Sequence, residues 1–296
     1  MNTENKGMLL GFVGIFIFSL TLPITKIAVQ TFDPYFLAYA RAAFAGMLAI
    51  GFLVTQKARL PTLKELPKYV WIALGTVYVF PILINVAMTD SLSSHSGVIL
   101  GIMPLATAIA GVFLYRDRPS WGFWATAVLG CVLVVLYGLL EGEGSLSYMD
   151  YLLIIACLFL AVSYAVGGEL SKLIDAKIVI SWTLVLSLPI NLIGSYFSFK
   201  GTYFSSSPEA LISFLYLSMF SMFIGFFFWY GGLALGGVAR VSQVQLLQPF
   251  CTLVASAFFL GEIITPRNIL FASLVVATVM LGKRMLIKKA KPGICD

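Results

Sequence analysis

Charged residues are scarce in this sequence. Lysine, arginine, aspartate and glutamate make up 11% of the 296 residues, whereas an ordinary soluble domain contains about 25%. Hydrophobic residues make up 60%, more than the core of a soluble protein requires. The composition therefore excludes an ordinary soluble protein and indicates a protein that lies within a membrane.

Residues with metal-binding, redox or nucleophilic chemistry are also few. The sequence has one histidine, His95, and four widely separated cysteines: Cys131, Cys157, Cys251 and Cys295. No two cysteines have the spacing of a metal or redox site, and the HExxH, GxSxG, P-loop and GxGxxG motifs are absent. We therefore expect no metal, no cofactor and no enzymatic activity, and the missing P-loop argues against an ATP-driven pump.

Long apolar runs, by contrast, fill almost the whole chain. A hydrocarbon core of about 30 Å is crossed by about 20 helical residues, and ten runs of about this length are separated by charges, glycines or prolines. They span residues 7–29, 34–55, 69–88, 94–115, 121–140, 148–168, 178–199, 209–231, 238–260 and 268–287. We predict an all-α integral membrane protein with ten transmembrane helices, short connections and no soluble domain.

The net charge of +6 is unevenly distributed among the connections. If the N-terminus lies in the cytoplasm, all but four of the 19 lysines and arginines fall on the cytoplasmic side, the exceptions being Lys26, Arg41, Lys200 and Arg267. This asymmetry follows the positive-inside rule, so we expect both termini in the cytoplasm. The orientation of the protein in the membrane accounts for the excess of positive charge, so no nucleic-acid partner is needed to explain it. The basic segment 283–291 is expected to contact anionic membrane lipid.

The two halves of the sequence resemble each other at a nearly constant offset. In this alignment Pro104 falls on Pro249, and Asp117 falls on Glu262. Because each half holds an odd number of apolar runs, the second half must enter the membrane from the side opposite to the first. We therefore predict two inverted five-helix repeats, residues 1–145 and 146–296, an arrangement common among secondary transporters.

Three segments also resemble a known family. They are FLYRDRPS at 113–120, AVGGELSKLIDAKIVISWTLVLSLP at 165–189 and FFLGEIITP at 258–266, and they are similar to the EamA type of the ten-helix drug/metabolite transporter superfamily. The resemblance implies export or exchange of amino acids, other small metabolites or drugs, frequently driven by the proton gradient. Glu262 keeps the acidic residue expected after the ninth helix, whereas Asp117 departs from the pattern by lying between two arginines.

Two prolines interrupt the fourth and ninth runs at equivalent positions. Pro104 and Pro249 each remove a backbone donor and disfavour regular helix at the preceding residue, so we predict a hinge near the middle of both helices. Carbonyl groups freed in this way need a partner or a water-lined cavity, and Gln245 and Gln248 lie beside the second break. Interruptions at equivalent positions of two repeats indicate a transport site; the alternative is that they only shape helix packing.

Other polar and aromatic side chains within the runs are expected to join the same cavity as substrate-binding residues. They are Ser19, Thr21, Tyr78, Asn85, Tyr164, Trp182, Trp229 and Tyr230. Together with the glutamines they predict an aromatic-rich pocket with neutral hydrogen-bonding groups, suited to a small amphipathic or zwitterionic molecule. A strongly anionic substrate would require more buried positive charge than this set contains. The alternative for each aromatic residue is a place in the core or at the membrane interface.

Two charged residues within or bordering the runs are costly in a membrane and therefore informative. Glu169 is the candidate for proton coupling, and the alternative is an ion pair with Lys172 one turn away. Arg41 requires an acidic or carbonyl partner, for which Asp33 and Asp90 are suitably placed in the sequence. For both residues a structural ion pair remains the competing interpretation.

These observations lead to one functional hypothesis and one alternative. We expect a multi-pass secondary transporter of the bacterial cytoplasmic (inner) membrane that exports or exchanges small metabolites such as amino acids by alternating access, with proton coupling as a further expectation. The alternative is a membrane-embedded enzyme or lipid-handling accessory protein that uses Glu169, Asp90 and His95. These three residues are predicted at opposite ends of the bilayer, which argues against a shared site. The oligomeric state stays open between monomer and homodimer.

Overall fold

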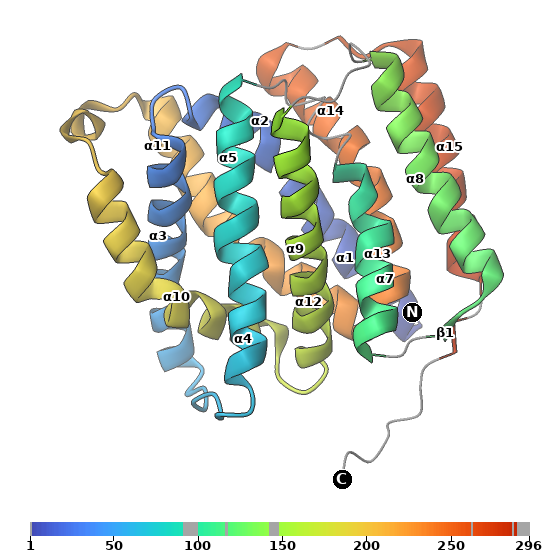
Figure 1. The fold of residues 1–296 in the computed structure, drawn as a ribbon, viewed down its shortest axis with the longest axis horizontal. Helices are drawn as coiled ribbons and strands as arrows, with labels where there is room; N and C mark the ends of the chain where they lie inside the picture. The colour runs from blue at the N-terminus through green and yellow to red at the C-terminus, as the bar shows by residue number, and fades with distance from the viewer. Residues whose placement is uncertain are drawn as a thin grey trace.

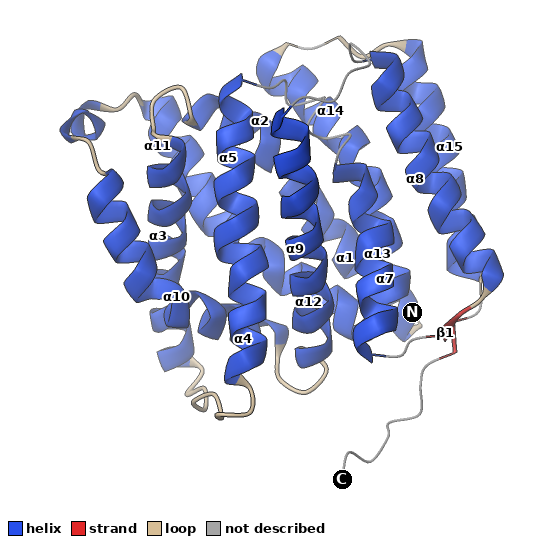
Figure 2. Ribbon diagram, in the orientation of Figure 1, coloured by secondary structure: helices blue, strands red, loops and turns tan. Residues whose placement is uncertain are grey.

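The computed structural model describes residues 2–90, 100–115, 118–141, 148–261, 263–285 and 287–288, and almost all of them are helical (Figure 2). The α-helices are α1 (Thr3–Ser19), α2 (Thr21–Ala28), α3 (Pro34–Thr55), α4 (Leu66–Ala73), α5 (Phe80–Asp90), α7 (Met103–Tyr115), α8 (Trp121–Glu141), α9 (Tyr148–Leu170), α10 (Ala176–Ser198), α11 (Pro208–Tyr216), α12 (Gly225–Gly236), α13 (Val238–Ser242), α14 (Gln248–Leu260) and α15 (Pro266–Arg284). Two short antiparallel strands, β1 (Arg118–Pro119) and β2 (Ile287–Lys288), join the start of α8 to the end of α15.

The helices lie side by side in one bundle (Figure 1). Within the described residues, seven helical segments are long and apolar enough to cross a membrane, and three further apolar helices are shorter. Each of the ten runs found in the sequence overlaps one of these segments. The class of all-helical membrane protein is therefore confirmed, while ten crossings and the side on which the termini lie stay predictions.

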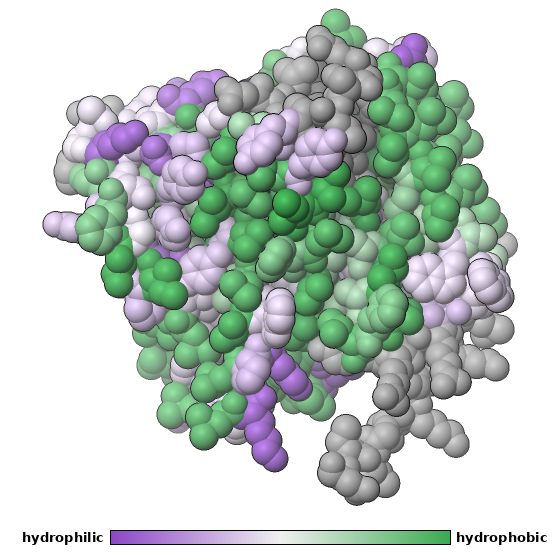
Figure 3. Space-filling view, in the orientation of Figure 1, coloured by the Kyte–Doolittle hydropathy of each residue, from purple (hydrophilic) through white to green (hydrophobic). Residues whose placement is uncertain are grey.

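The surface agrees with a position in lipid. The face drawn in Figure 3 carries a broad band of hydrophobic side chains across the middle of the bundle, and the hydrophilic ones gather toward its two ends. Large apolar side chains such as Trp121, Phe113 and Phe258 are exposed by more than four-fifths. An apolar exterior of this kind is stable only where hydrocarbon replaces water.

Several helices begin at a capping residue followed by proline. Asp33, Ser207 and Thr265 each accept a hydrogen bond from a backbone N–H in the first turn of the following helix, and each precedes a proline at the first helical position. Side-chain caps satisfy backbone donors that the helix leaves free, and proline lacks a donor that would be unpaired there. These sequence signals fix where α3, α11 and α15 begin.

Glycines allow α1 and α12 to approach each other closely. A Cβ atom added to Gly7 would lie 2.4 Å from the backbone nitrogen of Gly236, and one added to Gly232 would lie 2.6 Å from the nitrogen of Gly11. Small residues repeated every four positions permit such backbone contact in membrane proteins. The Glu4 carboxylate forms an ion pair with Arg240 at the end of the bundle that carries the N-terminus.

Candidate functional site

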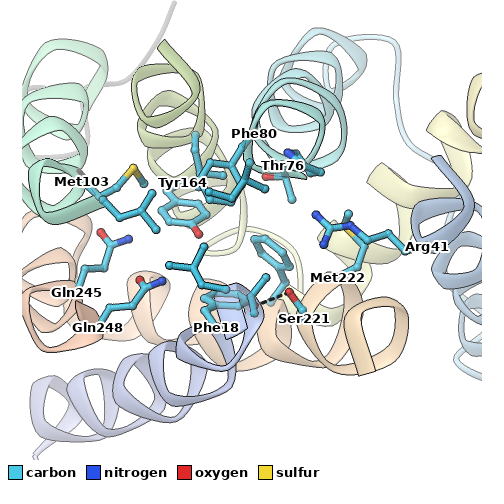
Figure 4. A pocket seen from close by; sticks show the side chains of 17 residues that line it. Phe18, Arg41, Thr76, Phe80, Met103, Tyr164, Ser221, Met222, Gln245 and Gln248 are labelled. Atoms are coloured by element: carbon cyan, nitrogen blue, oxygen red, sulfur yellow. Dashed lines mark hydrogen bonds between the residues drawn. The ribbon is translucent and has the colours of Figure 1, made fainter. Parts of the chain in front are cut away.

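A cavity with a volume of about 40 Å³ lies inside the bundle (Figure 4). This volume is well below the roughly 300–1,000 Å³ of an open small-molecule site, so a bound solute requires the walls to move apart. Apolar side chains, among them Phe18, Phe80, Ile84, Met222 and Phe226, form most of its wall. The polar lining residues are Thr21, Arg41, Thr76, Tyr164, Ser221, Gln245 and Gln248. An apolar wall with a few polar groups is the usual composition of a ligand site.

Interrupted helices supply many of the lining side chains. Thr76 lies in a π-helical segment, Leu74–Val79, that joins α4 to α5, and Ser221 lies in a second one, Leu217–Ile224, that joins α11 to α12. Gln245 lies in a 3₁₀ segment, Gln243–Leu247, that leads into α14. Irregular backbone at membrane depth is tolerated where it borders a cavity, and π-helical turns are frequent at functional sites. Interrupted segments from three parts of the chain therefore border this cavity.

Both predicted hinge prolines follow such an interruption. Pro104 is the second residue of α7, directly after the 3₁₀ segment Leu100–Ile102. Pro249 is the second residue of α14, directly after the 3₁₀ segment Gln243–Leu247. A proline in the first turn is compatible with the helix that it begins but not with a regular α-helix continuing through the residues before it. The breaks have the positions that the sequence predicts, and their action as hinges stays a prediction.

A chain of hydroxyl groups holds one wall of the cavity in place. The hydroxyls of Thr76 and Ser163 are hydrogen-bonded to each other, the Thr76 hydroxyl lies 3.2 Å from that of Tyr230, and the Ser163 hydroxyl donates to the carbonyl of Ile72 at 2.9 Å. Elsewhere on the cavity wall, the hydroxyls of Thr21 and Ser221 form a hydrogen bond of 2.9 Å. These bonds set the orientation of the lining hydroxyls before any solute enters.

Arg41 brings a positive charge to the cavity. The side chain is 2% exposed, and its Nε and Nη1 atoms have no hydrogen-bond partner among the described residues. The expected pair with Asp33 does not form, because Asp33 caps α3 and accepts a hydrogen bond from Lys200 at 3.2 Å. The side chain of Asp90, the other expected partner, and the whole of His95 lie outside the described residues. The expectation of a pocket with only neutral polar groups is therefore corrected by Arg41.

The predicted substrate-binding residues fall into three groups. Thr21, Tyr164, Gln245 and Gln248 line the cavity, as the sequence predicts. The second group is buried behind the lining and consists of Ser19, Asn85, Trp229 and Tyr230. The third group, Tyr78 and Trp182, bonds to backbone elsewhere in the bundle.

The residues behind the lining support it. Trp229 packs on Tyr164 with ring centroids 5.2 Å apart, and Tyr230 bonds to Thr76. The Asn85 amide donates to the carbonyl of Pro34 at 3.1 Å and so joins α5 to the start of α3. The Ser19 hydroxyl donates to the carbonyl of Phe16. These contacts position helices around the cavity and leave the side chains away from its surface.

Tyr78 and Trp182 join the bundle at other places. The Tyr78 hydroxyl donates to the carbonyl of Ser187 in α10 at 3.2 Å. The Trp182 indole donates to the carbonyl of Arg59, in the connection between α3 and α4, at 3.0 Å. Glu169, the proton-coupling candidate, is also absent from the described lining and forms an ion pair with Lys172. This pair is the structural alternative that the sequence left open.

The sequence did not identify several lining residues. Thr76 and Ser221 carry hydroxyls within apolar runs, and their exposure to the cavity depends on the two π-helical segments. Pro81 was a signal for the first of these segments, because proline disturbs the helix before it, whereas the second has no proline near it. Arg41 was recognised as a charged residue within a run that needs a partner, but the sequence did not place it in the cavity lining. The apolar wall residues could not be distinguished from other core residues by composition.

The fold and the cavity together define a class: a multi-pass helical membrane protein with a central, partly polar cavity bordered by interrupted helices. The chain belongs to the EamA-like transporter family, whose model matches residues 5–139 and 147–282. It is therefore a transporter of the drug/metabolite superfamily, as the resemblance in the sequence indicated.

Similar proteins carry the same description. An uncharacterized transporter, YdeK, of Bacillus subtilis (strain 168) is 42% identical over 88% of this chain and 91% of that protein. An uncharacterized transporter of Archaeoglobus fulgidus is 24% identical over 91% of this chain and 94% of that protein. A crystal structure with 15% identity superposes with a TM-score of 0.75 and covers 94% of this chain and 98% of its own, a likeness that shows the fold alone.

Proposed function

We propose that the protein is a secondary active transporter that exports or exchanges a small metabolite, such as an amino acid, by alternating access around the central cavity. The convergence of interrupted segments on this cavity carries the proposal. Side chains from two π-helical segments and from the breaks before α7 and α14 line the same space. Interrupted helices around a site near the middle of the membrane are characteristic of secondary transporters.

The proposed orientation places both termini in the cytoplasm of a bacterial cell, in the cytoplasmic membrane. It is supported by Figure 1, in which α1 begins and α15 ends at the same end of the bundle. The connections between α3 and α4 and between α9 and α10 reach that end as well, and they carry Lys57, Arg59, Lys64 and Lys172. Positive charge gathered at one end agrees with the positive-inside rule.

The proposed mechanism exchanges two conformations of inverted repeats, residues 1–145 and 146–296. Pro104 and Pro249 act as equivalent hinges, each between a 3₁₀ segment and an α-helix. The contact between α1 and α12 closes the cytoplasmic end of the cavity and separates in the other state. Coupling to protons through Glu169 is a separate proposal that requires the pair with Lys172 to open.

The test is exchange in proteoliposomes. Purified protein is reconstituted with a high internal concentration of unlabelled amino acids, and entry of radiolabelled phenylalanine, leucine and glutamine is followed over time, with protein-free vesicles as the control. The proposal predicts saturable entry that requires the internal solute. Absence of exchange for a broad panel of metabolites, with protein that still unfolds cooperatively, would contradict it and favour the membrane enzyme or lipid-handling alternative.

A further inference from the structure

The charge of Arg41 has no counter-charge in the cavity. Arg41 is the one charged residue among the described residues that line the cavity, and the guanidinium is aimed into it (Figure 4). Two of its nitrogens, Nε and Nη1, donate to no described group. An isolated buried cation is costly, and in membrane proteins such residues commonly belong to a substrate or ion pathway. The Arg41 cation therefore has no counter-charge among the side chains that the structure describes.

Asp33, one of the two acidic partners expected for Arg41, is engaged elsewhere. The Oδ1 atom of Asp33 accepts the backbone N–H of Tyr35 at 3.0 Å, and its Oδ2 accepts from Lys200 at 3.2 Å. Lys26, which is not among the lining residues, donates to the carbonyls of Met88 and Thr89 at 3.0 and 3.3 Å. Arg41 is therefore the cation left available to a solute that enters the cavity.

The two ends of the cavity differ in chemistry. Arg41 lies at one end, with the hydroxyls of Thr76 and Ser221 on the same side (Figure 4). Gln245 and Gln248 lie at the opposite end, and the Oε1 atom of Gln245 is buried without a hydrogen-bond partner among the described residues. Phe18, Phe80 and other apolar side chains lie between. A matching solute has an anionic group and an apolar body, and a polar group at its far end would add a bond to the glutamine amides.

We propose that Arg41 binds the carboxylate of the transported solute, and that the solute is an amphipathic monocarboxylate. The guanidinium fork presents parallel donors that match the two oxygens of a carboxylate, and such a pair is stronger than a neutral hydrogen bond. The Ser221 hydroxyl supplies a further donor beside it, and the glutamine amides bond the far end. This assignment rests on the proposed transport function and adds the chemical class of the solute to it.

Binding is tested without transport, by thermal unfolding of the purified full-length protein at constant ionic strength. The probes are three carboxylates, 4-methylpentanoate, 3-phenylpropanoate and phenylalanine, each beside its own amide, which has a similar shape without the carboxylate. A solute at about 100 times its dissociation constant is expected to raise the unfolding temperature by roughly 5 °C. The comparison of the simple acids with phenylalanine distinguishes an organic acid from an amino acid as the source of the carboxylate.

Three variants separate the role of Arg41 from general charge effects. Arg41→Met is expected to abolish the rise caused by a carboxylate, while its own stability without ligand is unchanged or increased, because an unpartnered buried charge is removed. Arg41→Lys keeps the charge without the fork and is expected to bind at least tenfold more weakly. Lys64→Met removes an exposed cation in the connection between α3 and α4, outside the cavity lining, and is the control, in which the rise is expected to persist.

Each result decides for or against the assignment. A rise with a carboxylate but not with its amide, lost in Arg41→Met and kept in Lys64→Met, supports it. The assignment is overturned by any of four results: an equal rise with the amide, a rise that persists in Arg41→Met, an equal rise with chloride or phosphate, or no rise with any carboxylate. Transport is judged separately by exchange of neutral solutes, so exchange without a carboxylate effect rejects the role of Arg41 and leaves the proposed function standing.

Discussion

Two neighbouring glycines of α12 provide a matched test of the packing between α1 and α12. A Cβ atom at Gly232 would lie 2.6 Å from the backbone nitrogen of Gly11 and 2.8 Å from the carbonyl oxygen of Gly7. A Cβ atom at Gly231 would meet side-chain atoms of Ala176 and Leu10 at 3.9 Å, an ordinary contact. Gly232→Ala and Gly231→Ala therefore add the same methyl group to the same helix in two different environments.

The magnitude follows from two opposing effects. Replacing glycine by alanine inside a helix stabilises it by about 1 kcal/mol, and Gly231→Ala is expected to gain up to about this amount. In Gly232→Ala the backbones must separate by about 0.8 Å, since 2.6 Å must increase to 3.4 Å. Overpacking typically costs about 1–3 kcal/mol. The free energy of unfolding of Gly232→Ala is therefore expected to lie about 1–3 kcal/mol below that of Gly231→Ala.

The assay is reversible unfolding of both variants in the same detergent, followed by circular dichroism. Equal stabilities of Gly231→Ala and Gly232→Ala would refute the reasoning, because they would show that α1 and α12 do not meet at backbone distance. A lower stability of Gly231→Ala than of Gly232→Ala would place the contact on the wrong face of α12.

Three further predictions concern a surface ion pair, the hinge and proton coupling. Hydrogen bonds from Arg59 and from the N–H of Thr62 lower the pKa of Glu65 from 4.5 to about 2. The stabilising contribution of the Glu65 carboxylate is therefore present above pH 4.5 and is lost as the pH falls toward 2. The stability difference between the wild type and Glu65→Gln should shrink over that range, and a constant difference would contradict this ion pair's contribution. Pro249→Ala is expected to slow exchange several-fold without lowering the unfolding temperature, because a continuous helix through the 3₁₀ segment Gln243–Leu247 removes the hinge; an unchanged exchange rate would remove Pro249 from the mechanism. Glu169→Gln should abolish any dependence of exchange on a pH gradient, and persistent dependence would leave Glu169 with only its structural pair to Lys172.

Much of the fold could be predicted from the sequence, because membrane helices are specified by length and apolarity. The ten runs overlap the helical segments, and caps such as Asp33 and Thr265 mark where helices begin. The paired prolines indicated where regular helix stops, and the glutamines next to Pro249 led to two residues that line the cavity. These signals are local, so the amino-acid sequence carries them directly.

The remaining site residues depend on information that is not local. Whether Tyr78 and Trp182 face the cavity depends on the rotation of their helices, which is set by packing against neighbours. The π-helical segment that presents Ser221 arises in an apolar run without proline, whereas the one that presents Thr76 ends two residues before Pro81. The sequence also indicated that Arg41 needs a partner, but only the structure shows that Asp33 is already engaged. The packing of helices that are distant in the sequence determines each of these contacts.

The central claim is that the cavity is the site through which a solute is exchanged. The most direct measurement compares exchange of a labelled solute in proteoliposomes containing the wild type or Gln248→Leu, a variant that changes one polar lining side chain at nearly constant volume. The account predicts that Gln248→Leu folds with an unchanged unfolding temperature and exchanges the solute at least tenfold more slowly at low solute concentration. Equal exchange by both proteins would contradict the claim and place the transport site elsewhere in the bundle.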